Sequence, residues 1–144
     1  MTKTCAKNLY RVIDANLNRA KEGLRVCEEV TRFILDNRRL TAFLKKIRHQ
    51  IDLLSRKVYP QVLLLETRKS DTDVGRLNSQ GELKRFNHQD IFWANLQRVK
   101  ESLRVLEEFS KLLDLGAAKG FKQLRYDLYE IEKKSFKKVS GLAR

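Results

Sequence analysis

The sequence has little of the composition that marks fibrous, disulfide-stabilised or membrane-spanning proteins. One proline and six glycines among 144 residues exclude a collagen-like or low-complexity chain. Two cysteines, Cys5 and Cys27, make no disulfide framework and indicate a reducing compartment. No apolar run exceeds four residues, as in 62–65, which is far too short to span a bilayer. The N-terminus has no apolar signal-peptide core, so we expect a cytoplasmic protein.

Acidic residues are too few to balance the basic ones. Thirty-one Lys and Arg against 18 Asp and Glu give a formal net charge of +13, which predicts an anionic partner. Nucleic acid, a membrane surface and phosphorylated metabolites all fit that sign. The two histidines, His49 and His88, lie far apart without a metal-ligand pattern, and no glycine-rich phosphate loop occurs. Charge alone therefore does not choose the partner.

The chain contains an internal duplication. Residues 94–114 repeat residues 15–35 at an offset of 79, and 11 of the 21 positions are identical. A weaker likeness continues at an offset of 77, where Arg125 corresponds to Arg48. The repeated unit reads as a helical hairpin, and two copies predict a four-helix core.

The predicted fold is all-α and forms one domain over residues 1–144. The first hairpin copy covers about 9–58, a linker and loop cover 59–89, and the second copy covers about 90–137. We expect the last seven residues to fray. The periodicity and the turn residues, with Asp90 as a helix N-cap, predict helices over about 9–35, 40–58, 60–66, 90–116 and 117–137.

Two polar residues of the first repeat fall within its apolar arc on a helical wheel. Asn16 and Arg19 are these residues, and the second copy repeats them as Asn95 and Arg98. A buried arginine needs a partner, so one interpretation is a structural bridge to a carboxylate on a facing helix. The other is that both arginines converge near a pseudo-twofold axis and hold an anionic ligand. The small residues next to them, Gly23 and Ser102, would leave space for it.

The long loop carries a second candidate cluster. Arg68 and Lys69 could hold phosphate oxygens, and Asp71 and Asp73 could share a divalent cation, as parts of a lid over a pocket. The alternative is an ordinary charged surface loop. In the second helix of each hairpin, Arg48 and Arg125 flank the apolar stripe and are weaker ligand candidates.

Four segments resemble one known family. They read RVIDANLNRAKEGLRVCEEVTRF, LKKIRHQID, ETRKSDTDVG and ANLQRVKESLRVLEEFSKLLD. Together they resemble the helical domain that is found N-terminal to some thiamine-phosphate synthases and also alone. That domain is an alternative hydroxymethylpyrimidine-phosphate kinase, unrelated to the ribokinase-like enzyme. The synthase barrel is missing from the chain, so the resemblance does not imply synthase activity.

The resemblance implies transfer of the ATP γ-phosphoryl to 4-amino-5-hydroxymethyl-2-methylpyrimidine phosphate, with Mg²⁺ as the metal. We expect catalytic residues at Arg19, Arg98 and Arg68, metal ligands at Asp71 and Asp73, and phosphate- or substrate-binding residues at Asn16, Asn95, Lys69, Arg48 and Arg125. Two alternatives remain open, a basic helical nucleic-acid-binding protein and a small all-α enzyme that binds another anionic metabolite. The wide apolar arc is compatible with a homodimer.

Overall fold

Two antiparallel helical hairpins make up the computed structural model, which describes residues 1–142. In the first hairpin, α1 (Lys3–Glu29) continues into a π-helical turn, η1 (Val30–Ile34), and α2 (Arg38–Val58) runs back. In the second, α5 (His88–Ser110) is followed by α6 (Leu115–Ser140). The described residues contain helices and no strand, so the all-α prediction is confirmed.

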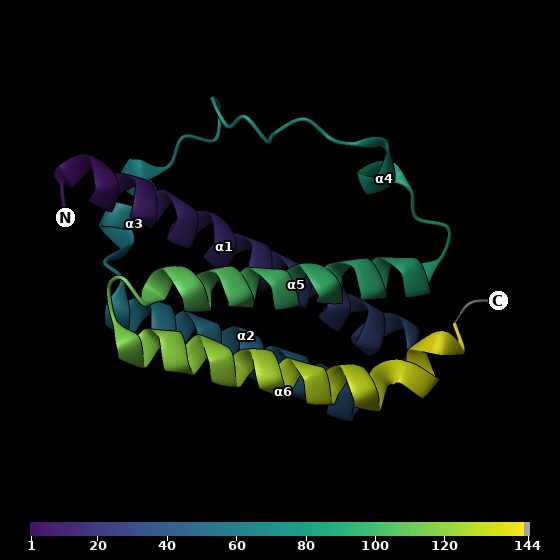
Figure 1. Ribbon diagram of the computed structural model, residues 1–144. Helices are drawn as coiled ribbons and strands as arrows, with labels where there is room; N and C mark the ends of the chain where they lie inside the picture. Colours follow the sequence, from purple (N-terminus) through teal and green to yellow (C-terminus); the bar gives the residue numbers. More distant parts are fainter. Residues whose placement is uncertain (143–144) are drawn as a thin grey trace.

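The four long helices form a two-layer bundle. In Figure 1, α1 and α5 lie antiparallel in one layer, and α2 and α6 form the other. Contacts join α1 to α5, α5 to α6, α6 to α2 and α2 to α1, so the helices close a ring around a common interior. The short helix α3 (Gln61–Thr67) packs against α1 at one end. The two hairpins therefore meet mainly through their first helices.

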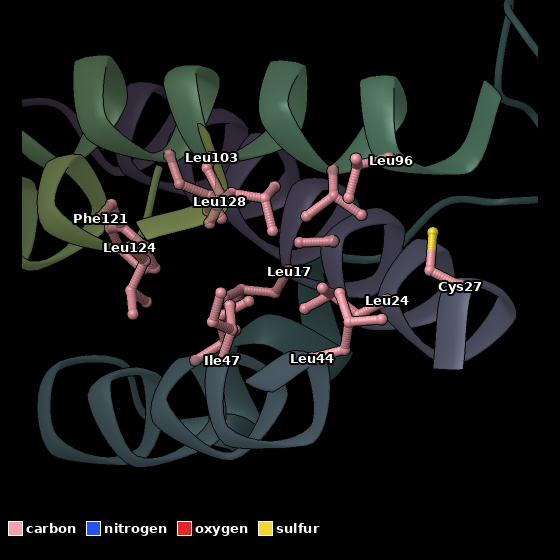
Figure 2. Packing of buried hydrophobic residues seen from close by; sticks show 14 of the residues in the cluster. Leu17, Leu24, Cys27, Leu44, Ile47, Leu96, Leu103, Phe121, Leu124 and Leu128 are labelled. Carbon is pink, nitrogen blue, oxygen red and sulfur yellow. The ribbon is translucent and has the colours of Figure 1, made fainter. Parts of the chain in front are cut away.

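The interior of the bundle is apolar. Figure 2 shows leucine side chains from both hairpins pointing toward one another between the helices. Each large side chain that is fully buried contributes roughly 1.5–3 kcal/mol to stability. Within residues 1–142, no helix is apolar over enough of its length to cross a membrane. The most completely buried large side chains are Phe92, Phe121, Ile13, Leu24, Leu44, Ile51, Leu96, Leu103, Leu106 and Leu128.

The first helix begins earlier than its apolar period predicts. It starts at Lys3 rather than near Leu9, because the hydroxyl of Thr2 accepts a hydrogen bond from the Cys5 amide at 3.2 Å and caps the helix. It also changes character before the expected end at position 35. The Leu35 amide donates to the Val30 carbonyl at 3.0 Å, which is the wider spacing of a π-helix.

The boundaries of the second hairpin also differ from the prediction. Asn87, not Asp90, is the N-cap of α5; its side chain accepts from the Asp90 amide at 2.8 Å. The Asp90 carboxylate accepts from the Phe86 amide at 3.0 Å, so the two side chains together satisfy amides at the helix start, as in a capping box but with the amide before the N-cap residue as donor. Helix α5 ends at Ser110, because Asp114 caps a new helix through the Ala117 amide at 2.8 Å.

The C-terminal helix and the predicted loop also differ from the sequence-based prediction. Helix α6 continues to Ser140, so the predicted fraying of the last seven residues is wrong for its first three; residues 143–144 lie outside the described part. In the predicted loop, one isolated turn forms as α4 (Gln80–Leu83).

Residues 68–87, here called the connecting segment, link the two hairpins. In Figure 1 the segment passes along the α1 and α5 side of the bundle and stays away from α2 and α6. Every residue from Arg68 to Phe86 is exposed. Even its apolar side chains are in solvent; Leu77 is 89% exposed and Phe86 is 86% exposed. The segment therefore contributes little to the core.

Candidate functional site

The duplicated arginines Arg19 and Arg98 are exposed, which corrects the prediction that they point inward. Helix α1 faces α5 through Gly23 and Cys27, whereas Leu17 and Leu24 face the bundle interior. On a wheel at about 100° per residue, Arg19 lies about 40° beyond Gly23, on the side away from the interior. The apolar arc is thus wider than the surface that the neighbouring helices cover, and its edge reaches solvent.

Both arginines nevertheless lie near the centre of the α1–α5 contact. Gly23 stands opposite Asn95 and Val99, and Arg98 lies between these two residues in the sequence. Arg19 is one helical turn before Gly23. The two arginines therefore lie about one helical turn apart along the bundle, on one surface, which we call the outer face. It is the surface of α1 and α5 on the side along which the connecting segment passes (Figure 1). Neither arginine has an ion pair among residues 1–142.

The two asparagines bond to their own helices. Asn16 donates from its side-chain nitrogen to the Val12 carbonyl at 2.9 Å, and Asn95 donates to the Ile91 carbonyl at 2.8 Å. Each bond spans one helical turn, so the asparagines do not join the helices to each other. The carboxamide oxygens have no protein donor in the described part of the chain, but Asn16 is buried, so the half-buried Asn95 is the better placed of the two to accept a bond from a ligand.

The expected space beside the arginines is absent. A β-carbon on Gly23 would lie 2.6 Å from Val99 Cγ2 and 3.0 Å from the Asn95 carbonyl oxygen. Its counterpart Ser102 is buried and donates to the Arg98 carbonyl at 2.7 Å. These small residues let the two helices approach closely, and any ligand must bind on the outer face and not between the helices.

Arg68 is held by a carboxylate, Asp14, that was not predicted from the sequence. Its Nε and Nη2 donate to the two oxygens of Asp14 at 2.7 and 2.8 Å. These hydrogen bonds raise the pKa of Arg68. Asp14 is buried in α1, and the repeat has Trp93 at the corresponding position. Lack of a repeat counterpart was the available signal that Asp14 has a role of its own. The pair fixes the beginning of the connecting segment to α1.

The other charged residues of the connecting segment point into solvent. Lys69, Asp71 and Asp73 are all exposed, and Asp73 accepts from the Gly75 amide at 2.9 Å. No group of three or more His, Cys, Asp or Glu side chains that could hold a metal occurs among the described residues. The structure therefore does not bring the segment and the two arginines into one assembled centre, and the metal role of Asp71 and Asp73 stays a prediction.

Arg48 and Arg125 form the structural bridges that were one interpretation of Arg19 and Arg98. Arg48 Nε lies 2.7 Å from Glu28 Oε2, and Arg125 Nη2 lies 2.8 Å from Glu107 Oε2. Glu28 and Glu107 are buried and occupy the same position of the repeat, so each hairpin is closed by the same ion pair.

The environment of Glu107 shows what the bridge contributes. Burial acts to raise the pKa of this carboxyl, but hydrogen bonds and positive charge from Arg125 and Arg104 outweigh it and lower the pKa. Burial likewise acts to lower the pKa of Arg125, and the bond to Glu107 leaves it raised. Arg48 and Arg125 are therefore engaged within the protein, which weakens the prediction that they bind substrate.

Known proteins are similar to this chain over most of its length. The model of the ThiD2 family matches residues 11–134. A thiamine-phosphate synthase from Nostoc punctiforme is 42% identical over 125 residues, which cover 86% of this chain and 34% of that protein. The one from Synechocystis is 43% identical over 86% of this chain and 35% of the relative. A third, from Rhodopirellula baltica, is 34% identical over 99% of this chain and 38% of its own length.

The match covers most of this chain but only part of each relative. The chain spans about a third of the length of these curated relatives. No solved structure matches. The family match covers most of both hairpins and the whole of the connecting segment between them. The chain therefore belongs to the ThiD2 family.

Proposed function

We propose that this protein is a kinase of thiamine biosynthesis. It transfers the γ-phosphoryl group of ATP to 4-amino-5-hydroxymethyl-2-methylpyrimidine phosphate and forms the diphosphate. Membership of the ThiD2 family and the thiamine-phosphate synthase names of the relatives support the pathway. The observation that carries the chemistry is the pair Arg19 and Arg98, which are duplicated, exposed and without ion pairs in the described residues, on the outer face.

The reaction suits a site that is rich in arginine and poor in bases. The attacking atom is an oxygen of a phosphate monoester, which is largely ionised at neutral pH because its second pKa is about 6. No general base is then needed. The barrier lies in bringing two polyanions together, and arginines lower it by neutralising and orienting phosphate oxygens. Arg19 and Arg98 hold these oxygens, and the free oxygen of the half-buried Asn95 orients the substrate, whereas Asn16 is buried.

The connecting segment supplies further charges in this proposal. Lys69 binds phosphate oxygens when the segment closes over the outer face, while Arg68 keeps the segment attached through Asp14. Asp71 and Asp73 fit Mg²⁺ by donor type, since they are carboxylates two residues apart and Mg²⁺ commonly takes one or two carboxylates with phosphates and water. The ion supplies charge neutralisation at the phosphates when bound.

Substrate choice tests this function directly. ATP consumption is measured with the phosphorylated pyrimidine and with the unphosphorylated alcohol at the same Mg²⁺ concentration. We expect turnover of the phosphate and at least several-fold to about 100-fold less of the alcohol, which needs a base and loses charge-assisted bonds worth roughly 1.5–3 kcal/mol each. Comparable rates would show that a base exists, and no turnover of either compound would contradict the proposal.

Two arginine substitutions test the site. We expect Arg19→Ala and Arg98→Ala each to reduce turnover by at least about 100-fold, because each removes a phosphate contact made in the transition state. Both side chains are exposed, so their loss should change the free energy of unfolding by less than about 0.5 kcal/mol. Lys46→Ala, an equal loss of charge on the exposed side of α2, is the control and should keep full activity. Large drops in melting temperature would instead make the arginines structural.

A further inference from the structure

A second charged surface lies at the turn of the first hairpin. Residues from the end of α1, the turn after η1 and the beginning of α2 line a groove of about 690 Å³, here called the turn groove. This volume lies in the range of small-molecule sites. Arg19, Arg98, Asn16 and Asn95 are not among its lining residues, so its lining is distinct from the arginine pair of the outer face. The proposed kinase chemistry uses none of its exposed cations.

The turn groove presents cations that the protein itself does not pair. Arg25, Arg32, Arg38 and Lys45 line it, and none of the four has an ion pair in residues 1–142. Arg48 also lines it, but its charge is matched by Glu28. Four guanidinium and ammonium groups around one concave surface favour an anion with several oxygens.

The second hairpin shows that this charge arrangement is not a by-product of the duplication. At the positions that correspond to Arg25 and Arg32, Arg104 pairs with Glu107 and Glu108 at 3.2 and 3.0 Å, and Lys111 pairs with Glu108 at 2.6 Å. The same places in the repeat therefore have satisfied cations in one copy and unpaired cations in the other. The hairpin therefore does not need unpaired cations at these two positions in order to be stable.

Hydrogen bonds of the backbone and of side chains fix the shape of the turn that lines the groove. The Asn37 amide donates to the Thr31 carbonyl at 2.8 Å, and the hydroxyls of Thr31 and Thr41 are 2.8 Å apart, which ties η1 to α2. Asp36 takes a left-handed φ of 49° to reverse the chain. Asn37 and Arg38, at the N-terminus of α2, line the groove. The partial positive charge of that helix end therefore adds to the four cations.

The lining also limits the kind of anion. It contains no phenylalanine, tyrosine or tryptophan, and the imidazole of His49 is the one aromatic ring in its lining, so it offers little surface for stacking a base. Three carboxylates also line the groove: Glu28, which pairs with Arg48, and Glu29 and Asp36, which lie among the unpaired cations. A phosphate chain that carries Mg²⁺ presents both signs of charge and matches this mixture better than a bare anion.

We infer that the turn groove is a second binding site, which takes the phosphate chain of a nucleoside triphosphate or of an inorganic polyphosphate. It is independent of the proposed kinase reaction.

Calorimetric titration of the whole chain with inorganic tripolyphosphate and with ATP, each with and without Mg²⁺, tests the site. We expect both ligands to bind, and Arg25→Ser with Lys45→Ser to weaken tripolyphosphate binding at least tenfold, because two charge-assisted bonds are lost. The matched control is Arg104→Ser with Lys122→Ser, the same repeat positions in the second hairpin, which should change affinity less than about twofold. All four side chains are exposed, so both variants should fold.

The measurements distinguish ATP from tripolyphosphate as the ligand, and the turn groove from the outer face as the site. Equal affinity for both ligands identifies the phosphate chain as the whole ligand, and tighter ATP binding adds the nucleoside; both results support the site. Tripolyphosphate binding should persist in Arg19→Ala with Arg98→Ala, so a failure of the kinase proposal leaves this measurement intact. No binding by the unmodified protein, or equal weakening in the control, would overturn the inference and reduce the groove to general charge attraction.

Discussion

At the scale of single residues, Gly23 decides how closely the two hairpins approach. The α-carbon of this residue faces Asn95 and Val99, and a methyl group there would meet both at or below 3.0 Å. In an exposed helix a glycine-to-alanine change stabilises by roughly 0.5–1 kcal/mol. Here the added carbon forces the helices or the Val99 side chain to move.

We therefore expect Gly23→Ala to destabilise the protein by about 1–3 kcal/mol, the usual cost of overpacking a core. Thermal or denaturant unfolding measures the change. Gly81→Ala serves as the control, because a β-carbon there would come no nearer than 4.0 Å to another atom, and should have little effect. Stability equal to or above that of the unmodified protein would show that the contact can relax at no cost.

At the scale of elements, the same ion pair closes both hairpins, between the first helix and the second. Truncating one partner of such a pair leaves a charge without its counter-charge. For Glu107→Gln we expect a loss of about 3 kcal/mol at neutral pH, since Arg125 is only 13% exposed and stays in place.

The effect should depend on pH in a defined direction. The folded pKa of Glu107 is lowered, so its contribution is present above the unfolded pKa near 4.5 and is lost as pH falls through the folded value. The stability difference between the unmodified protein and Glu107→Gln should therefore shrink in acid below that range. Unfolding measured from neutral pH downward tests this, with the exposed Glu130→Gln as control. A difference that stays constant in acid would mean that the ion pair is not its source.

The connecting segment is the element whose state we expect to depend on ligand. Its backbone has only a few internal hydrogen bonds, such as Arg76 amide to Asp73 carbonyl at 3.2 Å, so amide protons should exchange quickly in the free protein. We expect slower exchange between 69 and 87 when Mg·ATP and the phosphorylated pyrimidine are added, because Lys69 gains phosphate partners. The core helices give the internal control. Unchanged exchange in the segment would exclude closure over the outer face.

At the scale of the whole molecule, the net charge of +13 acts against the compact state. Raising sodium chloride from about 0.01 M to about 0.15 M shortens the screening length from roughly 30 Å to roughly 8 Å. The repulsion is long-ranged and the bridging ion pairs are largely buried, so we expect the melting temperature to rise by a few degrees. Potassium chloride at equal ionic strength should give the same rise. A fall would show that exposed ion pairs outweigh the repulsion.

Much of the fold could be predicted from the sequence, because the helices and the repeat follow from short-range patterns of residues. A period of 3.6 residues marked the four long helices, and the offset of 79 paired the hairpins. Helix ends were less accurate, as at α1 and α5, because capping depends on single side chains such as Thr2 and Asn87. The candidate site could be predicted only as residue names, since the wheel placed Arg19 within the apolar arc but could not say which edge of that arc a neighbour covers.

The sequence by itself determined the all-α class, the duplication, the basic charge and the family resemblance, each of which needs only residue identity and spacing. Tertiary structure decided that Arg19 and Arg98 face solvent, that Arg48 and Arg125 face buried glutamates, and that Asp14 holds Arg68. The physical reason is that burial and pairing depend on how closely two helices approach. Gly23 fixes that approach through contacts with residues more than 70 positions away, which no local period can report.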